Sequence, residues 1–147
     1  MISTDLMEFK KMADFALAPR KAPKSPGVYI LRMKNAEQFA RIKGNTDILY
    51  IGSTSNLKSR FNGYNNPGKS QYTNLKVNNF VKNFKHEAEF MWKVEESLES
   101  AKSSEHELLR RYLNEHHELP PLNGQDVRSL KITLPTEKLN IKVKESH

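Results

Sequence analysis

The sequence contains no cysteine in its 147 residues, and this absence excludes disulfide bonds and zinc sites built from thiolates. A chain without covalent cross-links is typical of a reducing compartment, so we expect a soluble, intracellular protein of the cytoplasm. No segment approaches the ~20 consecutive apolar residues of a membrane-spanning helix, and the N-terminus lacks the apolar core of a signal peptide. The five histidines show no zinc-ligand spacing.

Acidic residues are missing from a long central segment. No Asp or Glu occurs from Ile48 to His86, although the whole chain carries 17 acidic residues, 24 basic residues and a formal charge of +7. In any compact fold this segment forms a positive surface, and its cations, amides and aromatic rings suit phosphate and base contacts. A solvated basic face is the alternative, but the length of the acid-free run favours a polyanion partner.

Apolar residues recur along the chain with the spacing of helices and strands, and the 37% apolar content is enough for one core. The spacing predicts helices over residues 3–17 and 35–44, from Ser53 onward, from Asn74 onward, and from Leu98 to about His117. It predicts strands over residues 27–33, 48–52 and 89–95, and two short strands, 131–134 and 140–143, in the tail. The order of these elements predicts a single mixed α/β domain.

Two of these helix predictions depend on residues that are typical of helix ends. The helix over residues 3–17 is expected because four apolar residues recur at helical spacing and Pro19 would end it. The helix over residues 35–44 is expected because Asn35 can cap its start and Gly44 can end it.

Glu105 is the exceptional residue of the last long helix. It lies four residues after Ala101 and three before Leu108, so it shares the apolar stripe that should face the core. A carboxylate there must be paired or must bind a cation, because burying a bare charge is costly. A salt bridge to a lysine, or a position at the edge of the stripe, is the alternative that helical spacing alone favours.

Two tyrosines and an arginine–tyrosine pair are the other polar residues of interest. Tyr29 and Tyr50 lie in apolar strands, where a tyrosine is usually a core residue with a bonded hydroxyl. Arg60 and Tyr64 lie four residues apart and project from one helix face. If these side chains converged with Glu105, they would provide what phosphodiester cleavage needs: an arginine for the phosphate, a carboxylate for a divalent metal, and a phenol for water.

The order and spacing of these residues resemble the GIY-YIG nuclease superfamily. The matching elements are Gly27-Val28-Tyr29, Tyr50-Ile51-Gly52, Arg60, Tyr64, Glu105 and Asn123. The resemblance implies an α+β fold with a small three-stranded antiparallel sheet flanked by helices. In this chain we expect one domain over residues 1–147: an N-terminal helix with a basic linker (1–26), a nuclease core (27–123) and a strand-like extension (124–147).

The resemblance also implies a metal-dependent DNA endonuclease with one divalent ion, Mg²⁺ or Mn²⁺. By that likeness, Tyr29 and Tyr50 line the site, and Tyr29 is our choice for the general base. Arg60 would contact the scissile phosphate, and Glu105 would be the protein carboxylate on the metal. Glu107 is the less suitable carboxylate, because two positions along a helix means a different face.

Further residues receive supporting roles by the same likeness. Tyr64 would orient water or the leaving group, and Asn123 would support the site through hydrogen bonds. Lys58 would either stabilise a tyrosine anion or contact a phosphate, because a phenol with a pKa near ~10 is otherwise a poor base. The cations expected to bind DNA are Lys58, Arg60, Lys69, Lys76, Lys82 and Lys85.

Two other functions stay open: a nucleic-acid-binding module of the same fold that does not cut, and a basic domain that binds an acidic protein. Specificity for DNA would come from the additional segments, from a homodimer or from a partner. Aromatic and asparagine residues over 71–84 could stack on unpaired bases, which favours single-stranded or distorted DNA. The same aromatic residues could instead belong to the core.

Overall fold

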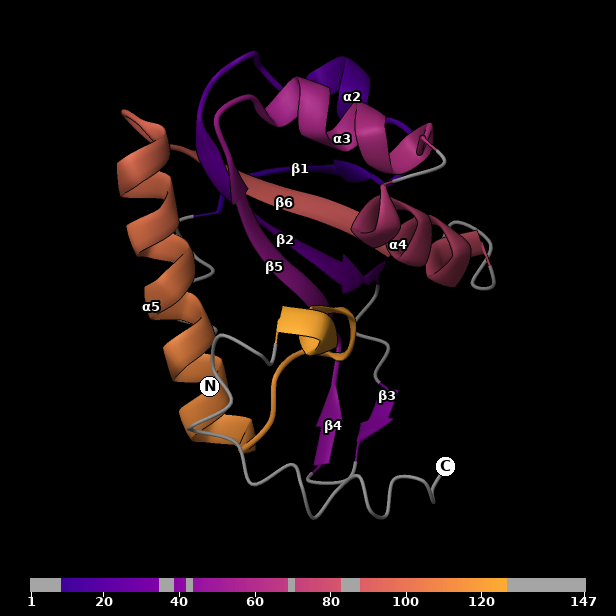
Figure 1. Ribbon diagram of the computed structural model, residues 1–147, viewed down its shortest axis with the longest axis vertical. Coiled ribbons are helices and arrows are strands. Elements are labelled where there is room, and N and C mark those ends of the chain that lie inside the picture. The colour runs from indigo at the N-terminus through magenta and orange to yellow at the C-terminus, as the bar shows by residue number, and fades with distance from the viewer. Residues whose placement is uncertain (1–8, 35–38, 42–43, 69–70, 83–87, 127–147) are drawn as a thin grey trace.

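The computed structural model describes residues 9–34, 39–41, 44–68, 71–82 and 88–126, and within them a four-stranded antiparallel sheet lies between helices (Figure 1). The strand order is β1-β6-β2-β5. The strands are β1 (Lys11–Asp14), β2 (Gly27–Met33), β5 (Ile48–Thr54) and β6 (Ala88–Val94), and a separate two-stranded sheet joins β3 (Phe39–Arg41) to β4 (Gly44–Thr46). The helices are α2 (Ala18–Lys21), α3 (Leu57–Asn65), α4 (Tyr72–Lys82), α5 (Leu98–His116) and the 3-10 helix η2 (Pro121–Asp126).

The central strand β2 is buried on both faces. Tyr29 and Leu31 pack in a core cluster with residues of α3 and α4, whereas Val28 and Ile30 pack in a second cluster with Leu108 of α5. Helices therefore cover both sides of the sheet, with α5 on one side and α3 and α4 on the other (Figure 1). Double coverage explains why β2 reads as a continuous apolar run and not as an alternating pattern.

Several predicted elements are confirmed. The strand over residues 27–33 is β2, and the strand over 48–52 is β5, which continues to Thr54. The helix expected from Ser53 begins at Leu57, because Asn56 and not an earlier residue caps it, its side chain accepting a hydrogen bond from the Ser59 amide at 3.0 Å. The predicted fold class of an antiparallel sheet flanked by helices is confirmed, with four strands where three were expected.

The predicted N-terminal helix over residues 3–17 is wrong for residues 9–17, and residues 1–8 lie outside the described ranges. Lys11–Asp14 form strand β1, in which Ala13 pairs with Phe90 of β6. The Phe15 ring also stacks on the Phe90 ring at 5.3 Å between centroids. Pairing with the edge of β6 and stacking on Phe90 therefore outweigh the helical spacing of this segment. Pro19, which was expected to end a helix, lies instead in the first turn of α2.

The predicted helix over residues 35–44 is also wrong in its described part. Phe39 pairs with Thr46, and Arg41 pairs with Gly44, as two strands of a hairpin. The helix predicted here would have been short, and a short helix without tertiary packing gains little stability. The connection between the antiparallel strands β2 and β5 instead continues as a second strand pair. The predicted tail strands, 131–134 and 140–143, lie outside the described residues.

Among the helices in the described ranges, none combines the length and the apolar character needed to cross a bilayer.

Gly27 stands where β2, β6 and the start of α3 meet at close range. A Cβ atom at this position would lie 2.6 Å from Leu57 Cδ1 and 2.7 Å from the Lys93 carbonyl oxygen. The second neighbour is backbone, so it cannot rotate away. The first glycine of the sequence motif therefore serves the packing of α3 on the sheet.

We expect Gly27→Ala to lower the free energy of unfolding by about 1 to 3 kcal/mol, the usual cost of overpacking a core. Chemical denaturation would measure the change. Gly68→Ala is the matched control, because a Cβ there would meet only the Gln71 side chain, at 3.3 Å, and should be nearly neutral. Equal effects of the two substitutions would contradict this account of Gly27.

Candidate active site

Tyr29, Tyr64 and Arg60 form one hydrogen-bonded cluster between β2 and α3. The two phenol oxygens lie 2.6 Å apart, and both side chains are buried. Arg60 Nε donates to Tyr29 Oη at 3.2 Å, and the guanidinium carbon of Arg60 lies 4.8 Å from the centre of the Tyr64 ring. Because Arg60 and Tyr64 lie one turn apart on α3, the helix presents both to the same point on β2.

Tyr50 joins this cluster from β5. Its ring centroid lies 6.2 Å from that of Tyr29 and 6.2 Å from that of Tyr64. In the β2–β5 register Tyr50 pairs with Leu31, two residues from Tyr29, so the two tyrosines share a face of the sheet. The structure thus brings together three aromatic phenols and one cation that lie on three separate elements.

Gly52 leaves the space that the Tyr29 ring occupies. The two residues are cross-strand partners. A Cβ at Gly52 would lie 2.6 Å from Tyr29 Cζ and from its hydroxyl, and 2.9 Å from Tyr50 Cε2. The Tyr29 ring therefore lies over the bare backbone of Gly52, and only glycine leaves room for it.

Glu105 approaches the cluster from α5. Its side chain is half-buried and accepts a hydrogen bond from Ser53 Oγ, one residue after Gly52 on β5. The Glu105 charge also contributes to a raised pKa at Tyr29, so the carboxylate lies within electrostatic reach of the phenols. From sequence alone Ser53 is only the start of a predicted helix; its position directly after Gly52 was the signal that could have linked it to the site.

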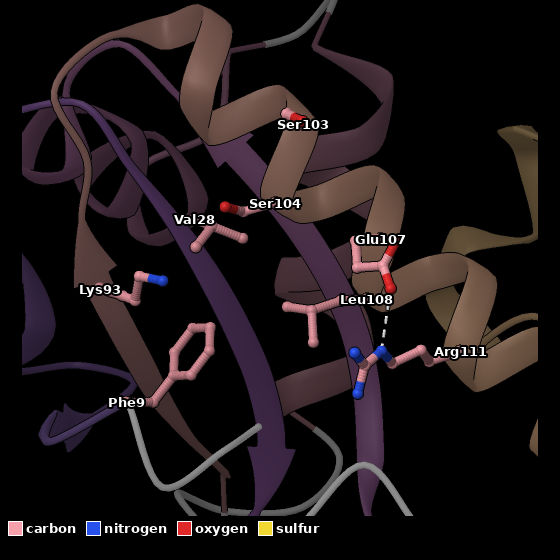
Figure 2. A pocket seen from close by; sticks show the side chains of 8 residues that line it. All are labelled: Phe9, Val28, Lys93, Ser103, Ser104, Glu107, Leu108 and Arg111. Carbon is pink, nitrogen blue, oxygen red and sulfur yellow. Dashed lines mark hydrogen bonds and ion pairs between the residues drawn. The ribbon is translucent and has the colours of Figure 1, made fainter. Parts of the chain in front are cut away.

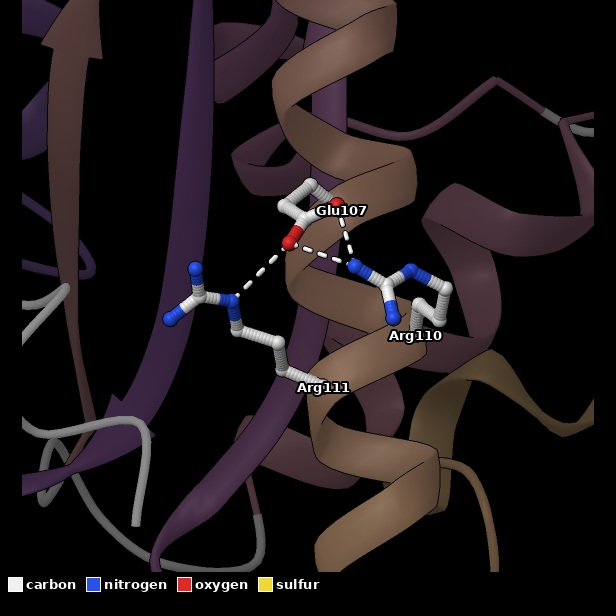
Figure 3. Close-up of polar contacts among 3 residues, drawn as sticks. All are labelled: Glu107, Arg110 and Arg111. Atoms are coloured by element: carbon white, nitrogen blue, oxygen red, sulfur yellow. Dashed lines mark hydrogen bonds and ion pairs between the residues drawn. The ribbon is translucent and has the colours of Figure 1, made fainter.

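Glu107 lies on a different face of α5, as its spacing predicted. Its carboxylate accepts hydrogen bonds from Arg110 Nη2 at 2.7 and 2.8 Å and from Arg111 Nε at 3.0 Å (Figure 3). Hydrogen bonds from these two arginines lower the pKa of Glu107. A carboxylate bound by two guanidinium groups is a poor ligand for a metal, so Glu105 is the better candidate.

A separate hollow of about 340 Å³ lies beside Glu107, between α5 and the sheet (Figure 2). Its apolar floor includes Val28 and Leu108, which belong to the core cluster on the α5 face. Tyr29 and Tyr64 belong to the cluster on the opposite face. The hollow and the tyrosine cluster are therefore two distinct features of the molecule.

Asn123 holds the outer edge of β5. Its Oδ1 accepts a hydrogen bond from the Ile51 amide at 3.0 Å, and its Nδ2 donates to the Ile51 carbonyl at 3.0 Å. Ile51 lies between Tyr50 and Gly52, and β5 is the last strand of the sheet. One side-chain amide thus satisfies both main-chain groups of an edge residue, as a neighbouring strand would.

Burial raises the pKa of the Tyr29 phenol, and the Arg60 charge and a hydrogen bond with Tyr64 lower it by less. Burial also raises the pKa of Tyr64 well above its ordinary value. The hydrogen bond between them has opposite effects, since it lowers the pKa of Tyr29 and raises that of Tyr64. Both phenols are protonated at neutral pH, and Tyr29 is the one whose anion receives more support.

Arg60 is a permanent cation in this setting. Burial lowers the pKa of its guanidinium, but the neighbouring Tyr29 and Tyr64 outweigh that effect and raise it. Lys58, the other cation proposed for the tyrosines, projects from a different side of α3, two residues before Arg60. Its Nζ donates to the Pro19 carbonyl at 2.6 Å, so the structure brings Lys58 to α2.

The remaining lysines expected to bind DNA fall into two groups. Lys76 is half-buried and Lys82 is exposed, both on α4, whereas Lys69 and Lys85 lie outside the described residues. Helix α4 packs beside the tyrosine cluster, because Asn78 Nδ2 donates to the Tyr64 carbonyl at 2.9 Å.

Comparisons with known proteins found one matching family and several similar solved structures. The family model described as the GIY-YIG catalytic domain matches residues 25–118. The GIY-YIG N-terminal endonuclease domain of UvrC from Thermotoga maritima, bound to magnesium, is 23% identical with a TM-score of 0.48, covering 74% of this chain and 94% of that chain. A point mutant of that domain is 22% identical with a TM-score of 0.47, covering 74% and 92%. These likenesses assign no residue of this chain a role. The comparison with curated proteins found no match.

We expect Asn123→Ala to lower the free energy of unfolding by about 2 to 4 kcal/mol, because it leaves two buried main-chain groups of Ile51 without partners. Hydrogen exchange at the Ile51 amide should accelerate in the variant. Asn62→Ala is the control, since Asn62 is exposed on α3. Unchanged protection of the Ile51 amide would show that Asn123 does not hold the edge of β5.

Proposed function

We infer that this chain, which belongs to the GIY-YIG family of catalytic domains and is a DNA endonuclease, hydrolyses phosphodiester bonds with one divalent metal ion. The observation that carries the proposal is the meeting of Arg60, Tyr29 and Tyr64 in one cluster within electrostatic reach of Glu105. A phosphate-binding cation, phenols for proton transfer and a carboxylate for a cation are the groups that phosphodiester hydrolysis uses.

The residues present fit a hard divalent ion such as Mg²⁺ or Mn²⁺. Glu105 offers a half-buried carboxylate with a hydroxyl oxygen of Ser53 beside it. Within the described ranges no group of three or more acidic or histidine side chains could hold a metal. Mg²⁺ commonly binds through one or two carboxylates and keeps several waters, so this donor set suits it. When bound, such an ion supplies positive charge for the leaving oxygen and a lower pKa for water.

Arg60 is proposed to bind the scissile phosphate. Its Nε is committed to Tyr29, and the contact with the Tyr64 ring fixes the plane of the guanidinium. The fork of Nη groups remains to approach a phosphate oxygen in a bidentate arrangement. Because the cation is already oriented before DNA binds, little side-chain entropy is lost when the phosphate arrives.

Tyr29 is proposed to accept the proton of the attacking water. Its oxygen is the acceptor of the Arg60 hydrogen bond, and the Tyr64 hydroxyl lies close enough to donate a second one. Two donors on one oxygen favour the anion, which is why the Tyr64 contact lowers the pKa of Tyr29. In this proposal Tyr64 donates a hydrogen bond to Tyr29 and so stabilises its anion. Tyr50 forms one wall of the cluster.

A binding module without catalysis, or a domain that binds an acidic protein, would not need these contacts. Each position of the motif that should carry a polar side chain does so in this chain. The Tyr29, Arg60 and Tyr64 side chains contact one another. Arg60 lies in the cluster, and α3 and α4 carry basic residues but no acidic residue, which suits DNA as the substrate.

The decisive measurement is cleavage of end-labelled single-stranded and duplex DNA with Mg²⁺ or Mn²⁺, and with chelator. We expect metal-dependent cleavage, reduced about 100-fold or more in Arg60→Ala and in Glu105→Ala, because each removes charge stabilisation at the reacting phosphate. Glu105→Ala should still bind DNA. Glu107→Ala is the matched control on the same helix and should cut within about twofold of wild type, since removing a solvated surface carboxylate has little effect.

Three results would contradict parts of this proposal. Cleavage that persists in chelator would exclude the metal. Salt-sensitive DNA binding without cleavage by the wild type would indicate a binding module, and no DNA binding would indicate a protein-binding domain.

We expect Tyr29→Phe to reduce the single-turnover cleavage rate by about 100- to 10,000-fold, the usual contribution of a general base. In the wild type the rate should increase with pH in the neutral to alkaline range, because the raised pKa of Tyr29 leaves only a small fraction of phenolate at neutral pH. Tyr50→Phe is the comparison variant and should retain more activity. Similar rates in the Tyr29→Phe variant and the wild type would assign the base elsewhere.

A further inference from the structure

The outer face of α4 carries a row of three polar and aromatic side chains. Tyr72, Lys76 and Asn79 follow one another at i, i+4 and i+7, so they lie along one side of the helix. The opposite side, with Val77 and Val81, is buried in the core cluster that contains the tyrosines. We call the row formed by Tyr72, Lys76 and Asn79 the α4 face.

Tyr72 is unusual among the aromatic residues. Its side chain is 74% exposed, whereas every other aromatic side chain whose burial is described is buried or half-buried. Helix α4 itself contains no acidic residue, and neither does the chain from Ile48 to His86. The α4 face therefore combines an open aromatic ring with a lysine on a helix that has no acidic residue, a combination that suits single-stranded nucleic acid.

The α4 face is tied to the candidate active site through the side of α4 that packs on α3. Asn78 Nδ2 donates to the Tyr64 carbonyl at 2.9 Å, and the Asn74 side chain lies over Gly63, where a Cβ would come within 3.1 Å of its Nδ2. These contacts fix α4 against the helix that carries Arg60 and Tyr64. DNA bound on the α4 face would therefore lie one helix away from α3, which carries the proposed phosphate site.

We propose that the α4 face binds single-stranded DNA, with the Tyr72 ring stacked on an unpaired base. In a duplex both faces of each base are already stacked, so an exposed ring on a rigid helix finds a partner only where bases are unpaired. Lys76, one turn further, can approach a phosphate, and the Asn79 amide can reach a base edge. This inference rests on the proposed nuclease function, because it names the form of DNA which that site receives.

Binding is tested with the full chain in chelator, so that no cleavage occurs, by fluorescence anisotropy of a labelled single strand and of its matched duplex. Tyr72→Ala should weaken single-strand binding by about 5- to 100-fold and duplex binding by less than about twofold. Tyr72→Phe should bind like the wild type, because it keeps the ring. Val94→Ala, at a half-exposed apolar residue on β6, is the control and should change neither affinity.

A 2-aminopurine base in the single strand provides a direct signal for stacking. Its fluorescence should be quenched on binding by the wild type and by Tyr72→Phe, but not by Tyr72→Ala. Equal losses on both forms of DNA, no loss in Tyr72→Ala, or no binding of single strands by the wild type would each overturn the proposal. If single-strand binding depends on Tyr72 while no variant or wild type cuts DNA with metal, the stacking site stands and the proposed catalysis fails.

Discussion

The contact of the Tyr29 ring with the backbone of Gly52 is the constraint on which the rest of the site depends. With the ring over a bare backbone, its hydroxyl reaches both Tyr64 and Arg60 on α3. Any side chain at residue 52 would displace the ring and separate the sheet from the helix at this point. Gly27 likewise leaves room for a close approach, at the point where α3 starts near β2 and β6. The two glycines of the motif thus set how near the helix comes to the strands.

The tyrosines of the candidate active site are also residues of the hydrophobic core. The Tyr29 and Tyr64 rings pack edge to face, and the Phe61 and Phe90 rings around them stack at 4.2 Å between centroids. Such packing holds the phenols in fixed positions, but burial raises their pKa values, which opposes proton abstraction. Arg60 offsets part of this effect. Burial thus fixes the positions of the phenols but makes them weaker bases. A loss of activity in a variant of this cluster must therefore be compared with the change in the free energy of unfolding of the same variant.

Local patterns in the sequence predicted β2, β5 and the long helix α5, because their apolar residues pack within continuous elements. They did not predict β1, since the pairing of Ala13 with Phe90 joins residues far apart in the chain. The Ser53–Glu105 and Asn123–Ile51 hydrogen bonds also join residues far apart in the chain. The motif predicted tyrosines and an arginine that the structure brings together, but the fourth strand and the hairpin required tertiary contacts. No feature of the described residues supports the homodimer considered as one source of specificity.

The β3–β4 hairpin interrupts the connection between the two strands that carry Tyr29 and Tyr50. Its strands pair with each other in a separate sheet, and in Figure 1 they extend away from the main sheet. The register of β2 with β5 is set instead by their own pairing, and Asn123 holds the outer edge of β5. The hairpin is therefore a place where the chain can grow or shrink between related proteins without disturbing the tyrosines, because lengthening a loop costs little free energy.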